Sequence, residues 1–471
     1  MTAKSHAFPQ AARAALGDAR LQGALANLKR GFQSKRAEAF AALSDPEGLR
    51  AAGAAIRAEA LARLPDLLVQ FEAKVTAAGG HVHWARDARE ARVTVGNILK
   101  ARGARMVTKG KSMVAEEIGL NAYLEAQGIA PVETDLGEYI IQLRKEPPSH
   151  IVAPAFHLRR SDVEQSFRKA HPALAPARKL ESGAALVAEA RAVLREKFLA
   201  AGAGITGANF LVAETGTAII VTNEGNGDLT RLLPRVHIVV ASIEKAVANL
   251  AGAAVLLRLL TRSATGQEIT CYVTFASGPR REGDADGPEE FHVVLLDNGR
   301  SSLLASPARE VLKCIRCGAC LNHCPVYGAV GGHAYGAVYP GPIGAAFNPG
   351  IEGIAGTHHL PSASSFCGRC EEVCPVKIPL TRIMRHWRGE AFARGISSPL
   401  FAFGLRLWAR IARRPMLYAI FAALFARILR AAARTRGRLS SFPAFRGWFA
   451  FRDLAVPAKR SFQSQWRAGK R

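Results

Sequence analysis

Apolar side chains in the first part of the chain recur at the spacing of amphipathic helices. Residues 11–30 and 49–64 both show this 3.6-residue period, and the chain has no proline between Pro9 and Pro46. We therefore expect a helical N-terminal extension over residues 1–65. Its surfaces are predicted to serve packing and contacts with partners.

Residues 66–300 alternate between short apolar runs typical of strands and longer runs with a helical period. The expected strands are residues 81–85, 104–108, 149–153, 208–214, 217–222 and 235–241. The expected helices are residues 113–127, 180–199 and 243–260. Strands that alternate with helices in this way indicate an α/β domain with a largely parallel sheet.

The pattern changes again after residue 300. In residues 301–395 the strand-like runs disappear, and Cys, Gly and Pro become frequent. Aliphatic side chains are too few there for apolar burial alone to fold the segment, so its folding is expected to depend on metal binding. Residues 396–471 then alternate between apolar and Arg-rich stretches. Their longest uncharged run, residues 416–426, is shorter than the ~20 residues of a membrane-spanning helix, and we do not expect it to span.

Charge is concentrated in that last segment. The 471-residue chain has a formal net charge of +25, and residues 401–471 contain 14 Arg, 2 Lys and 1 Asp. A basic tail of this kind binds nucleic acid, an anionic membrane or an acidic partner. The aromatic residues of the tail lie among apolar neighbours, which favours burial over stacking on bases, so no nucleic-acid partner is expected. Docking at the membrane interface and docking on a partner subunit both remain open.

The use of cysteine indicates metal binding. The N-terminal sequence shows no apolar stretch typical of a secretory signal, so we expect a cytoplasmic protein, in a compartment where thiols stay reduced. Seven of the eight cysteines fall within residues 314–374, which favours metal ligands over disulfides. The eighth, Cys271, lies alone in a strand-like run and is expected to be a buried, unreactive thiol.

The first cysteine motif has the spacing of bacterial ferredoxins. It reads Cys314-Ile-Arg-Cys317-Gly-Ala-Cys320-Leu-Asn-His-Cys324-Pro, which is C-x2-C-x2-C-x3-C-P. The first three cysteines wrap the chain around one cubane-type cluster, and in two-cluster ferredoxins the fourth serves the other cluster. Zinc fits poorly, because structural zinc sites take four ligands that usually come as two separate pairs.

The second motif is one cysteine shorter. It reads Cys367-Gly-Arg-Cys370-Glu-Glu-Val-Cys374-Pro, and Ser364 occupies the place of the missing cysteine. A crossed assignment follows from these spacings. Cluster 1 is predicted to take Cys314, Cys317, Cys320 and Cys374, and cluster 2 to take Cys324, Cys367 and Cys370.

The fourth ligand of cluster 2 is open. Cluster 2 is either a [4Fe–4S] cube whose last iron binds Ser364, a histidine, water or an exogenous group, or a [3Fe–4S] cluster. Four histidines lie near the motifs: His323, His333, His358 and His359. In the simpler interpretation they are ordinary loop residues and do not bind the cluster.

Polar residues also gather at the expected strand ends of the α/β domain. Thr108-Lys-Gly-Lys-Ser-Met113 follows a strand and precedes a helix, where backbone amides and lysines can hold an anion. Ligands of α/β sheets usually bind at the carboxyl ends of strands. The residues predicted to line such a pocket are Lys109, Lys111, Glu214, Glu224 and Asn226. It is equally open that these are ordinary loop residues that bind no ligand. The sequence identifies no catalytic residue.

Together these segments resemble a known family. Four of them are similar to the lactate utilization protein B family, and they are followed by the cysteine motifs: Thr108-Lys-Gly-Lys-Ser-Met113, Thr134-Asp-Leu-Gly-Glu-Tyr139, Ala213-Glu-Thr-Gly-Thr217 and Asn223-Glu-Gly-Asn-Gly-Asp228. The resemblance covers about residues 30–400. It implies a LUD domain, related in fold to the sugar isomerase and CoA-transferase superfamily, and then an α-helical ferredoxin-type domain with two [4Fe–4S] clusters. The family carries the same shortened second motif, so Ser364 is no departure from it.

The resemblance also implies a role. Members are taken to be the iron–sulfur subunit of a three-protein system that oxidises L-lactate to pyruvate, with a cysteine-rich CCG-domain protein and a smaller LUD-domain protein as partners. We therefore expect an electron-transfer subunit that passes electrons singly to an acceptor. The basic tail lies outside the resemblance, so a peripheral contact with the inner face of the membrane stays one of its two open roles.

Whether the chain is itself an enzyme is open. The alternative is a LUD-domain enzyme that acts on a carboxylate or acyl substrate and carries structural clusters. In that alternative, Lys111, Glu214 and Glu224 would do the chemistry.

Overall fold

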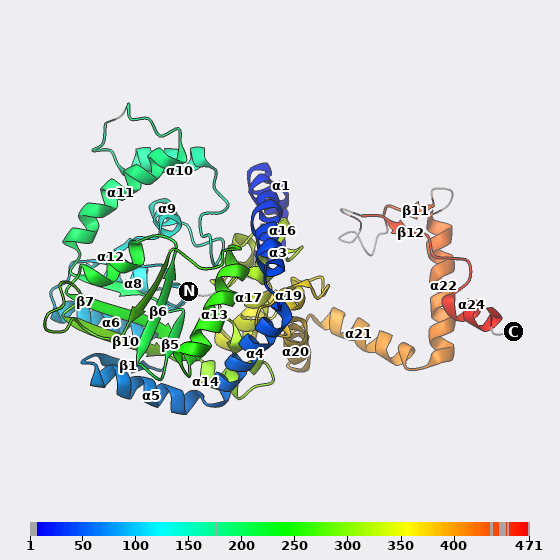
Figure 1. The fold of residues 1–471 in the computed structure, drawn as a ribbon. Helices are drawn as coiled ribbons and strands as arrows, with labels where there is room; N and C mark the ends of the chain where they lie inside the picture. Colours follow the sequence, from blue (N-terminus) through cyan, green and yellow to red (C-terminus); the bar gives the residue numbers. More distant parts are fainter. Residues whose placement is uncertain (1–6, 176, 434–436, 442–448, 450–451, 470–471) are drawn as a thin grey trace. The chain divides into compact units, whose positions relative to one another are not determined.

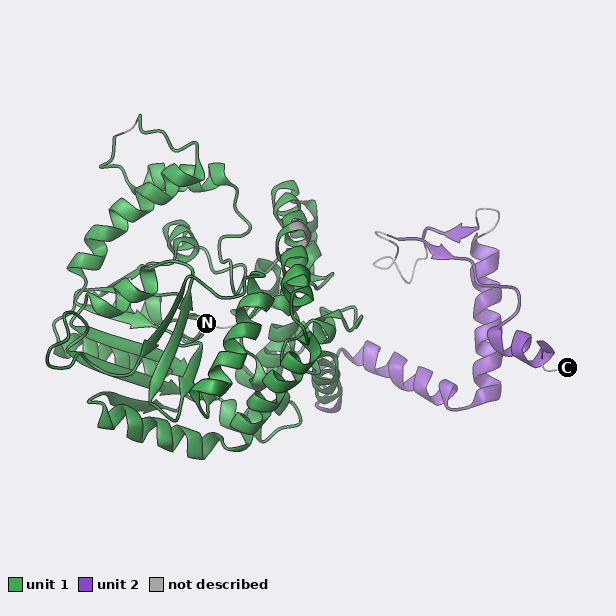
Figure 2. Ribbon diagram, viewed as in Figure 1, with its two compact units in different colours: residues 1–391 green, residues 392–471 purple. Residues whose placement is uncertain are grey.

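The computed structural model describes residues 7–175, 177–433, 437–441, 449 and 452–469. The chain divides into two compact units, residues 1–391 and residues 392–471 (Figure 2). The predicted helical extension, the α/β domain and nearly all of the cysteine-rich segment fall in the first unit. The second unit contains the basic tail.

A six-stranded sheet lies at the centre of the first unit, within the described residues (Figure 1). Its neighbouring strands are all parallel, in the order β1-β10-β7-β4-β2-β3. The strands are β1 (His81–Ala85), β2 (Met106–Lys109), β3 (Ala130–Glu133), β4 (Ala203–Thr206), β7 (Val236–Ser242) and β10 (Glu290–Leu296). The predicted α/β class with a mostly parallel sheet is confirmed.

Both faces of this sheet are covered, so β7 is buried along its whole length and is apolar at nearly every position. One face packs against three helices, α6 (Ala88–Ala101), α7 (Met113–Glu117) and α8 (Leu120–Ala126). The other face packs against α5 (Leu64–Ala77) and a second sheet. Ile238 and Val240 of β7 enter the first core, whereas Val239 enters the second. Successive residues thus point to opposite faces, as the two-residue period of a strand requires.

The second sheet has four strands in the order β8-β5-β6-β9. β6 is antiparallel to both β5 and β9, and β5 is parallel to β8. The strands are β5 (Phe210–Val212), β6 (Thr217–Thr222), β8 (Ala246–Val247) and β9 (Tyr272–Ala276). Leu211 and Ala218 of this sheet share one core with α5.

Five of the six predicted strands are present: β1 and β6 have their predicted bounds, and β2, β5 and β7 have shifted ends. The strand predicted at residues 149–153 is wrong. His150 Nδ1 accepts hydrogen bonds from the backbone N–H groups of Val152 at 3.0 Å and Ala153 at 3.1 Å. These amides are satisfied inside a local turn, so they are not available to a sheet.

Two predicted helices are shorter than expected. The helix predicted over residues 113–127 is split into α7 and α8 at Gly119, whose φ of 63° lies in the left-handed region. The helix predicted from residue 243 begins later, as α13 (Leu250–Ala264). Asn249 caps its start by accepting a 2.8 Å hydrogen bond from the Gly252 N–H, and β8 occupies part of the preceding stretch.

The remaining helices of the α/β part lie on the outside of the central sheet (Figure 1). They are α9 (Leu136–Arg144), α10 (Arg160–Ala170), α11 (Gly183–Ala200) and α12 (Asn226–Leu232). The described N-terminal residues are helical as predicted, in α1 (Phe8–Gly17), α2 (Ala19–Leu28), α3 (Ser34–Ala41) and α4 (Pro46–Ala62). Helices α3 and α4 pack on α13, while α1 and α2 pack on a helix of the cysteine-rich segment.

The cysteine-rich segment consists of short helices and loops. The helices are α14 (Arg300–Leu304), α15 (Ala319–Asn322), α16 (Tyr327–Val330), α17 (Gly341–Ile351), α18 (Ile354–Thr357), α19 (Arg369–Glu372) and α20 (Leu380–Ala393). Fully buried aromatic side chains supply much of its apolar interior, among them Tyr327, Tyr335, Tyr339 and Phe347. The helical, cysteine-rich region that was predicted to follow the sheet domain is confirmed.

The second unit contains two longer helices, α21 (Pro399–Ala412) and α22 (Pro415–Ala433). Its other described elements are the antiparallel pair β11 (Arg438–Leu439) and β12 (Leu454–Ala455), and α24 (Phe462–Gly469). The uncharged run at residues 416–426 is only part of α22, because the helix continues through Arg427 and Arg430. By length and composition alone, this 19-residue helix could cross a membrane. The predicted shortness of this segment is therefore wrong, because α22 extends beyond the uncharged run.

Candidate metal centres and the adjoining cavity

The two cysteine motifs have the same backbone conformation. The glycine of each Cys-Gly pair has a left-handed φ, 73° at Gly318 and 80° at Gly368, and each stands directly before a short helix, α15 or α19. Arg316 and Phe366, which precede the two Cys-Gly pairs, also have left-handed φ values, 60° and 54°. Non-glycine residues seldom adopt this region. The two segments are therefore a structural repeat.

The seven cysteines of the motifs fall into two groups. One group lines a single cavity and consists of Cys314, Cys317, Cys320 and Cys374. The other three cysteines do not line that cavity and lie close enough for their charges to interact, and Cys370 is also close enough to act on Cys320 of the first group: Cys324, Cys367 and Cys370. Each group draws cysteines from both motifs. This is the grouping that the predicted ligand sets require, and the ligand roles themselves stay a prediction.

Backbone N–H groups are directed at the sulfur atoms. Arg316 N–H donates to Cys314 Sγ at 3.3 Å, Tyr327 N–H to Cys324 Sγ at 3.5 Å, and Ile378 N–H to Cys374 Sγ at 3.3 Å. Such hydrogen bonds stabilise negative charge on sulfur and contribute to the reduction potential of a cluster bound there.

Burial raises the pKa of most of these thiols. Removal from water is the largest cause at Cys317 and Cys370, where the pKa rises to about 12, and at Cys374, where it rises to about 11. Cys367 differs, because hydrogen bonding from the backbone N–H of Arg369 lowers its pKa. These thiols lie close together, and their sulfur atoms accept hydrogen bonds from backbone N–H groups. Both features favour a metal group that binds the cysteines as thiolates. Sulfur donors in sets of four and three fit iron–sulfur clusters better than a closed four-ligand zinc site.

Ser364 occupies the place in the second motif that Cys314 has in the first. Ser364 Oγ accepts the backbone N–H of Phe366 at 3.1 Å, just as Cys314 Sγ accepts the backbone N–H of Arg316 at 3.3 Å. The repeat thus extends to this position, with oxygen in place of sulfur. Three of the four histidines near the motifs make hydrogen bonds to backbone carbonyls. A ring nitrogen of His323 donates to the Ala319 carbonyl, and His333 and His358 donate to other backbone carbonyls.

A buried charge network connects the α/β part with the cysteine-rich segment. Arg300 is fully buried and pairs with both oxygens of Glu117, at 2.9 and 2.7 Å. Its Nε lies 2.7 Å from Glu244, whose other oxygen lies 3.3 Å from Arg316 Nη2. Tyr339 O–H donates to Glu117 at 2.7 Å. Burial alone would raise the pKa of both carboxyls, but the arginines hold the pKa of Glu117 below its usual value and lower that of Glu244 to about 2.

Arginines of the N-terminal helices hold the second cysteine loop by its backbone. Arg36 Nη2 donates to the carbonyl of Val373 at 2.9 Å, and Arg50 Nη2 donates to that of Cys374 at 2.9 Å. The N-terminal extension therefore contributes directly to the position of the last cysteine. Sequence reasoning missed this contribution, because nothing in the spacing of the arginines shows which distant carbonyl they reach.

Arg57 has a similar role at the first cysteine loop. It is 1% exposed and donates to the carbonyl of Leu312 at 3.0 Å, two residues before Cys314. Its Nη1 also donates to the carbonyl of Ala246 in β8 at 2.9 Å. One guanidinium group thus joins the second sheet to the start of the cysteine motif.

A cavity of about 370 Å³ lies where several strands of the central sheet end. Lys111 follows β2, Asp135 follows β3 and Lys245 follows β7, and all three line the cavity. This is the usual place for a ligand in an α/β sheet. Of the predicted pocket residues, Lys111, Glu224 and Asn226 line the cavity. Sequence reasoning missed Lys245, whose pKa burial lowers to about 8.

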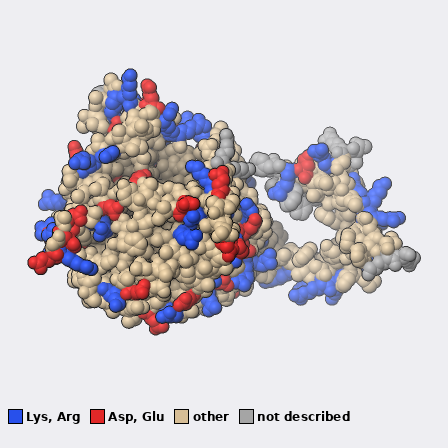
Figure 3. Space-filling view, in the orientation of Figure 1, with Lys and Arg blue, Asp and Glu red and all other residues tan. Residues whose placement is uncertain are grey.

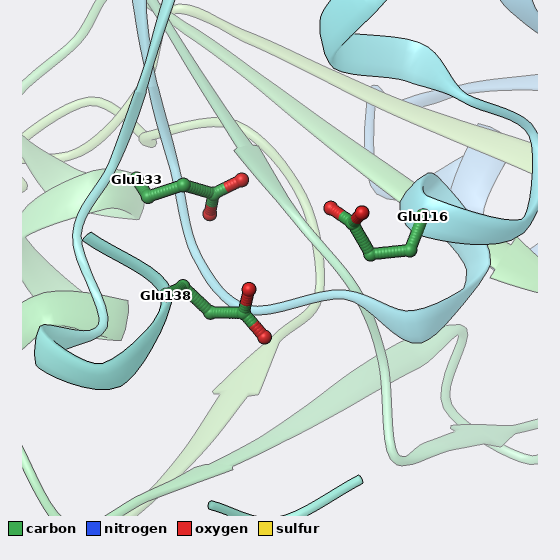
Figure 4. Close-up of side chains that lie close together, drawn as sticks. All are labelled: Glu116, Glu133 and Glu138. Carbon is green, nitrogen blue, oxygen red and sulfur yellow. The ribbon is translucent and has the colours of Figure 1, made fainter. Parts of the chain in front are cut away.

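Lys109 lies outside this cavity, in a buried group of carboxyls. Its ammonium is 2.7 Å from Glu133 and 3.4 Å from Glu116. Figure 4 shows these two glutamates and Glu138 pointing toward one another, and their oxygens lie within 4.8 Å of each other. Burial raises the pKa of Glu138 to about 8. Lys109 thus acts as the internal counter-ion of the group.

Glu214 and Cys271 also lie apart from the cavity. Glu214 caps α13, because its carboxylate accepts the backbone N–H of Leu250 at 3.2 Å. The buried thiol predicted at Cys271 is wrong, since this cysteine is exposed. The apolar run around it is interrupted, and β9 begins only at the next residue, Tyr272.

The second unit exposes many large apolar side chains within its described residues. They include Leu400, Phe401, Phe403 and Trp408 on α21, and Met416, Ile420, Phe421 and Leu424 on α22. Only 11% of the most apolar window of α22 is buried. Residues 392–471 contain a single acidic residue, Asp453. Figure 3 shows the same contrast in charge, with acidic and basic groups mixed on the visible face of the first unit. Apolar surface flanked by arginines marks a contact with a membrane or another protein.

Two family models match the chain. The model of the LUD domain matches residues 68–296, and that of the 4Fe-4S dicluster domain matches residues 310–378. The first covers the central sheet, and the second covers all seven cysteines of the two groups.

Curated relatives match most of the chain. Lactate utilization protein B from Geobacillus sp. (strain WCH70) is 42% identical over 455 residues, which are 95% of this chain and 94% of the relative. Lactate utilization protein B from Bacillus subtilis (strain 168) is 43% identical over 82% of this chain and 81% of the relative. The uncharacterized electron transport protein YkgF from Escherichia coli (strain K12) is 40% identical over 97% of this chain and 95% of the relative.

Proposed function

Because this chain belongs to the lactate utilization protein B family, we propose that it is the iron–sulfur electron-transfer subunit of a system that oxidises L-lactate to pyruvate. The observation that carries the proposal is the arrangement of the cysteines in two groups, each drawn from both motifs, within a matched dicluster domain. The names of the relatives support it, since one concerns lactate utilization and another electron transport.

In this proposal the group of four cysteines holds one [4Fe–4S] cluster, and the group of three holds a second cluster with a non-cysteine fourth position. Each bound cluster carries one electron, so a pair can divide the two electrons that lactate oxidation releases. The chain itself supplies the thiolates, the N–H groups directed at sulfur and an apolar surrounding that excludes water. The arginines of the N-terminal helices keep the two cysteine loops in place.

We propose the partners that family membership implies. They are a CCG-domain protein, a smaller LUD-domain protein and an electron acceptor. We also propose that α21 and α22 hold the protein on the anionic inner face of the membrane. Their exposed apolar side chains and the near absence of acidic residues in this unit support that contact over one with a basic partner.

The cavity favours a second function, in which the LUD domain acts on a carboxylate or acyl substrate and the clusters are structural. Its volume of about 370 Å³ and its position at the strand ends suit a small ligand. Turnover by the purified chain alone, at a rate unaffected by the redox state of the clusters, would favour this function over electron transfer.

The test of electron transfer starts with anaerobic purification of the chain and its two proposed partners. Iron and sulfide analysis counts the clusters, and EPR spectra are recorded before and after addition of L-lactate. We expect lactate to reduce the clusters only when the partners are present. Cells whose only copy carries Cys370→Ser should fail to grow on lactate, whereas Cys271→Ser, at an exposed thiol outside both groups, should grow normally. Normal growth of cells whose protein lacks iron would refute the proposal.

A further inference from the structure

The cavity of the α/β part and the cavity of the first cysteine group share part of their walls. Ile151 and Arg316 line both. Arg316 belongs to the first cysteine motif, where it lies between Cys314 and Cys317. A ligand that contacts Arg316 from the larger cavity would therefore lie beside the sulfur atoms of the first group.

The guanidinium group of Arg316 is held in place by its neighbours, but not all of its N–H groups have hydrogen-bond partners. It stacks on the rings of Tyr339 and Phe347, with a distance of 4.4 Å to each centroid. Its Nη2 faces Glu244 at 3.3 Å. Its Nη1 is buried and has no hydrogen-bond partner among the described residues. Buried donors of this kind nearly always have a partner, so this nitrogen is a donor held ready for a ligand.

A second cation faces the same cavity. The side chain of Lys245 is buried and lines the cavity, and the described residues offer its ammonium no hydrogen bond or ion pair. Arg316 and Lys245 lie close enough to repel each other, and the carboxylate of Glu244, which Arg316 faces, attracts both. Two like charges that converge on one cavity are stabilised by an anion placed between them.

The other charged residues of the wall reduce the positive charge of this pair but leave the wall net positive. Lys111 donates to the carbonyl of Val152 at 2.5 Å and adds a third positive charge. The two acidic residues of the wall are Asp135, which caps α9, and Glu224, which accepts the backbone N–H of Leu136 at 3.4 Å. Both carboxylates are thus engaged with the start of α9.

We propose that this cavity binds a small organic acid, whose carboxylate is held by Arg316 and Lys245 beside the first cysteine group. The planar fork of arginine suits a planar carboxylate, and a lysine completes its charge. The inference rests on the proposed function in one respect only. The proposed oxidation of lactate is the reason to choose short hydroxy and keto acids as the first compounds to test. The bound carboxylate adds a negative charge at Arg316, which adjoins Cys317 and lies two residues from Cys314, so it makes reduction of a cluster held there less favourable.

The binding experiment uses the full-length, cluster-loaded protein under anaerobic conditions. Isothermal titration calorimetry measures binding of propionate, L-lactate and pyruvate, with propionamide as the neutral control of the same shape. EPR redox titration follows the potential of the clusters with and without each compound. We expect the acids to bind and to shift one cluster to a more negative potential, and propionamide to do neither.

Variants assign the binding to the named residues. Lys245→Met should weaken acid binding about tenfold or more, the value of one charge-assisted hydrogen bond. It should fold, because an apolar side chain replaces a buried charge that makes no hydrogen bond or ion pair with the described residues. Lys245→Arg keeps the charge and should retain binding. Lys100→Met, at an exposed position on α6, is the matched control and should bind like the wild type.

Three outcomes would overturn the inference. They are equal binding of propionate and propionamide, undiminished binding to Lys245→Met, and displacement of the acids by an equal concentration of inorganic phosphate, which would assign the site to phosphate. None of these affects reduction of the clusters by lactate with the partners present. Conversely, acid binding to a protein whose clusters are never reduced would reject only the proposed function.

Discussion

Replacing Glu117 by glutamine removes one charge from the buried network and keeps the size of the side chain. Glu117 accepts two hydrogen bonds from Arg300 at 2.9 and 2.7 Å, one from Tyr339 and one from Asn298. Breaking a buried ion pair from one side costs about 3–5 kcal/mol, since the partner charge stays buried. For a unit of 391 residues that unfolds as one, this equals a fall in Tm of roughly 4–6 °C.

The effect of Glu117→Gln should depend on pH in one direction. The pKa of Glu117 is lowered in the folded protein, so its carboxylate stabilises the fold above the usual value of 4.5, and this contribution is lost as the pH falls through the folded pKa. The Tm difference between wild type and variant should therefore be constant near neutral pH. It should shrink as the pH falls below about 4.5.

Differential scanning calorimetry of the anaerobic, cluster-loaded protein measures this difference. Glu125→Gln is the matched control, because Glu125 is exposed on the neighbouring helix α8 and its replacement should change stability by less than about 0.5 kcal/mol. A Tm for Glu117→Gln within about 1 °C of the wild type at neutral pH, with iron content unchanged, would show that the pair contributes little stability.

Three further predictions concern the clusters and the second unit. Cys314→Ser should lower iron per chain to about half while Cys271→Ser leaves it unchanged, and equal iron in the two variants would contradict the two-group assignment. Ser364→Cys should alter the EPR signal of the second cluster and slow its loss in air, whereas identical spectra would mean that position 364 does not reach the metal. Deletion of residues 399–469 should abolish co-sedimentation with phosphatidylglycerol vesicles, and binding by the full chain should weaken with added salt; retained binding after the deletion would refute the membrane contact.

The sequence predicted the class of the fold because its signals are local. The run from Val236 to Ser242 is apolar at nearly every position, and such a run shows a buried parallel strand without knowledge of its neighbours. The predicted strands and helices were wrong where a side chain takes the backbone hydrogen bonds that the expected element needs. His150 uses the amides of its own loop, and Asn249 starts a helix several residues later than the apolar period indicates.

The two cysteine groups could be predicted from the sequence, because the spacing of the cysteines along the chain indicates which of them serve the same cluster. The cavity could be foreseen only in part. Lys111 and Glu224 follow recognisable strand ends, but Lys245 and Arg316 come from two distant segments that meet only in the folded protein. Lys109 has the same local signal as Lys111, and only the fold shows that its ammonium pairs with buried glutamates and does not line the cavity.

The hydrogen bond from Arg50 to the carbonyl of Cys374 has a consequence for biosynthesis. Arg50 leaves the ribosome early, whereas Cys374 is made near the end of the first unit, and the two must meet before the last sulfur of the first cavity is in place. Iron delivered to the nascent chain before that moment would find only three sulfur atoms at this cavity. Cofactor loading is therefore a late event, and a ribosome stalled before residue 374 would release a chain unable to retain its metal at this site.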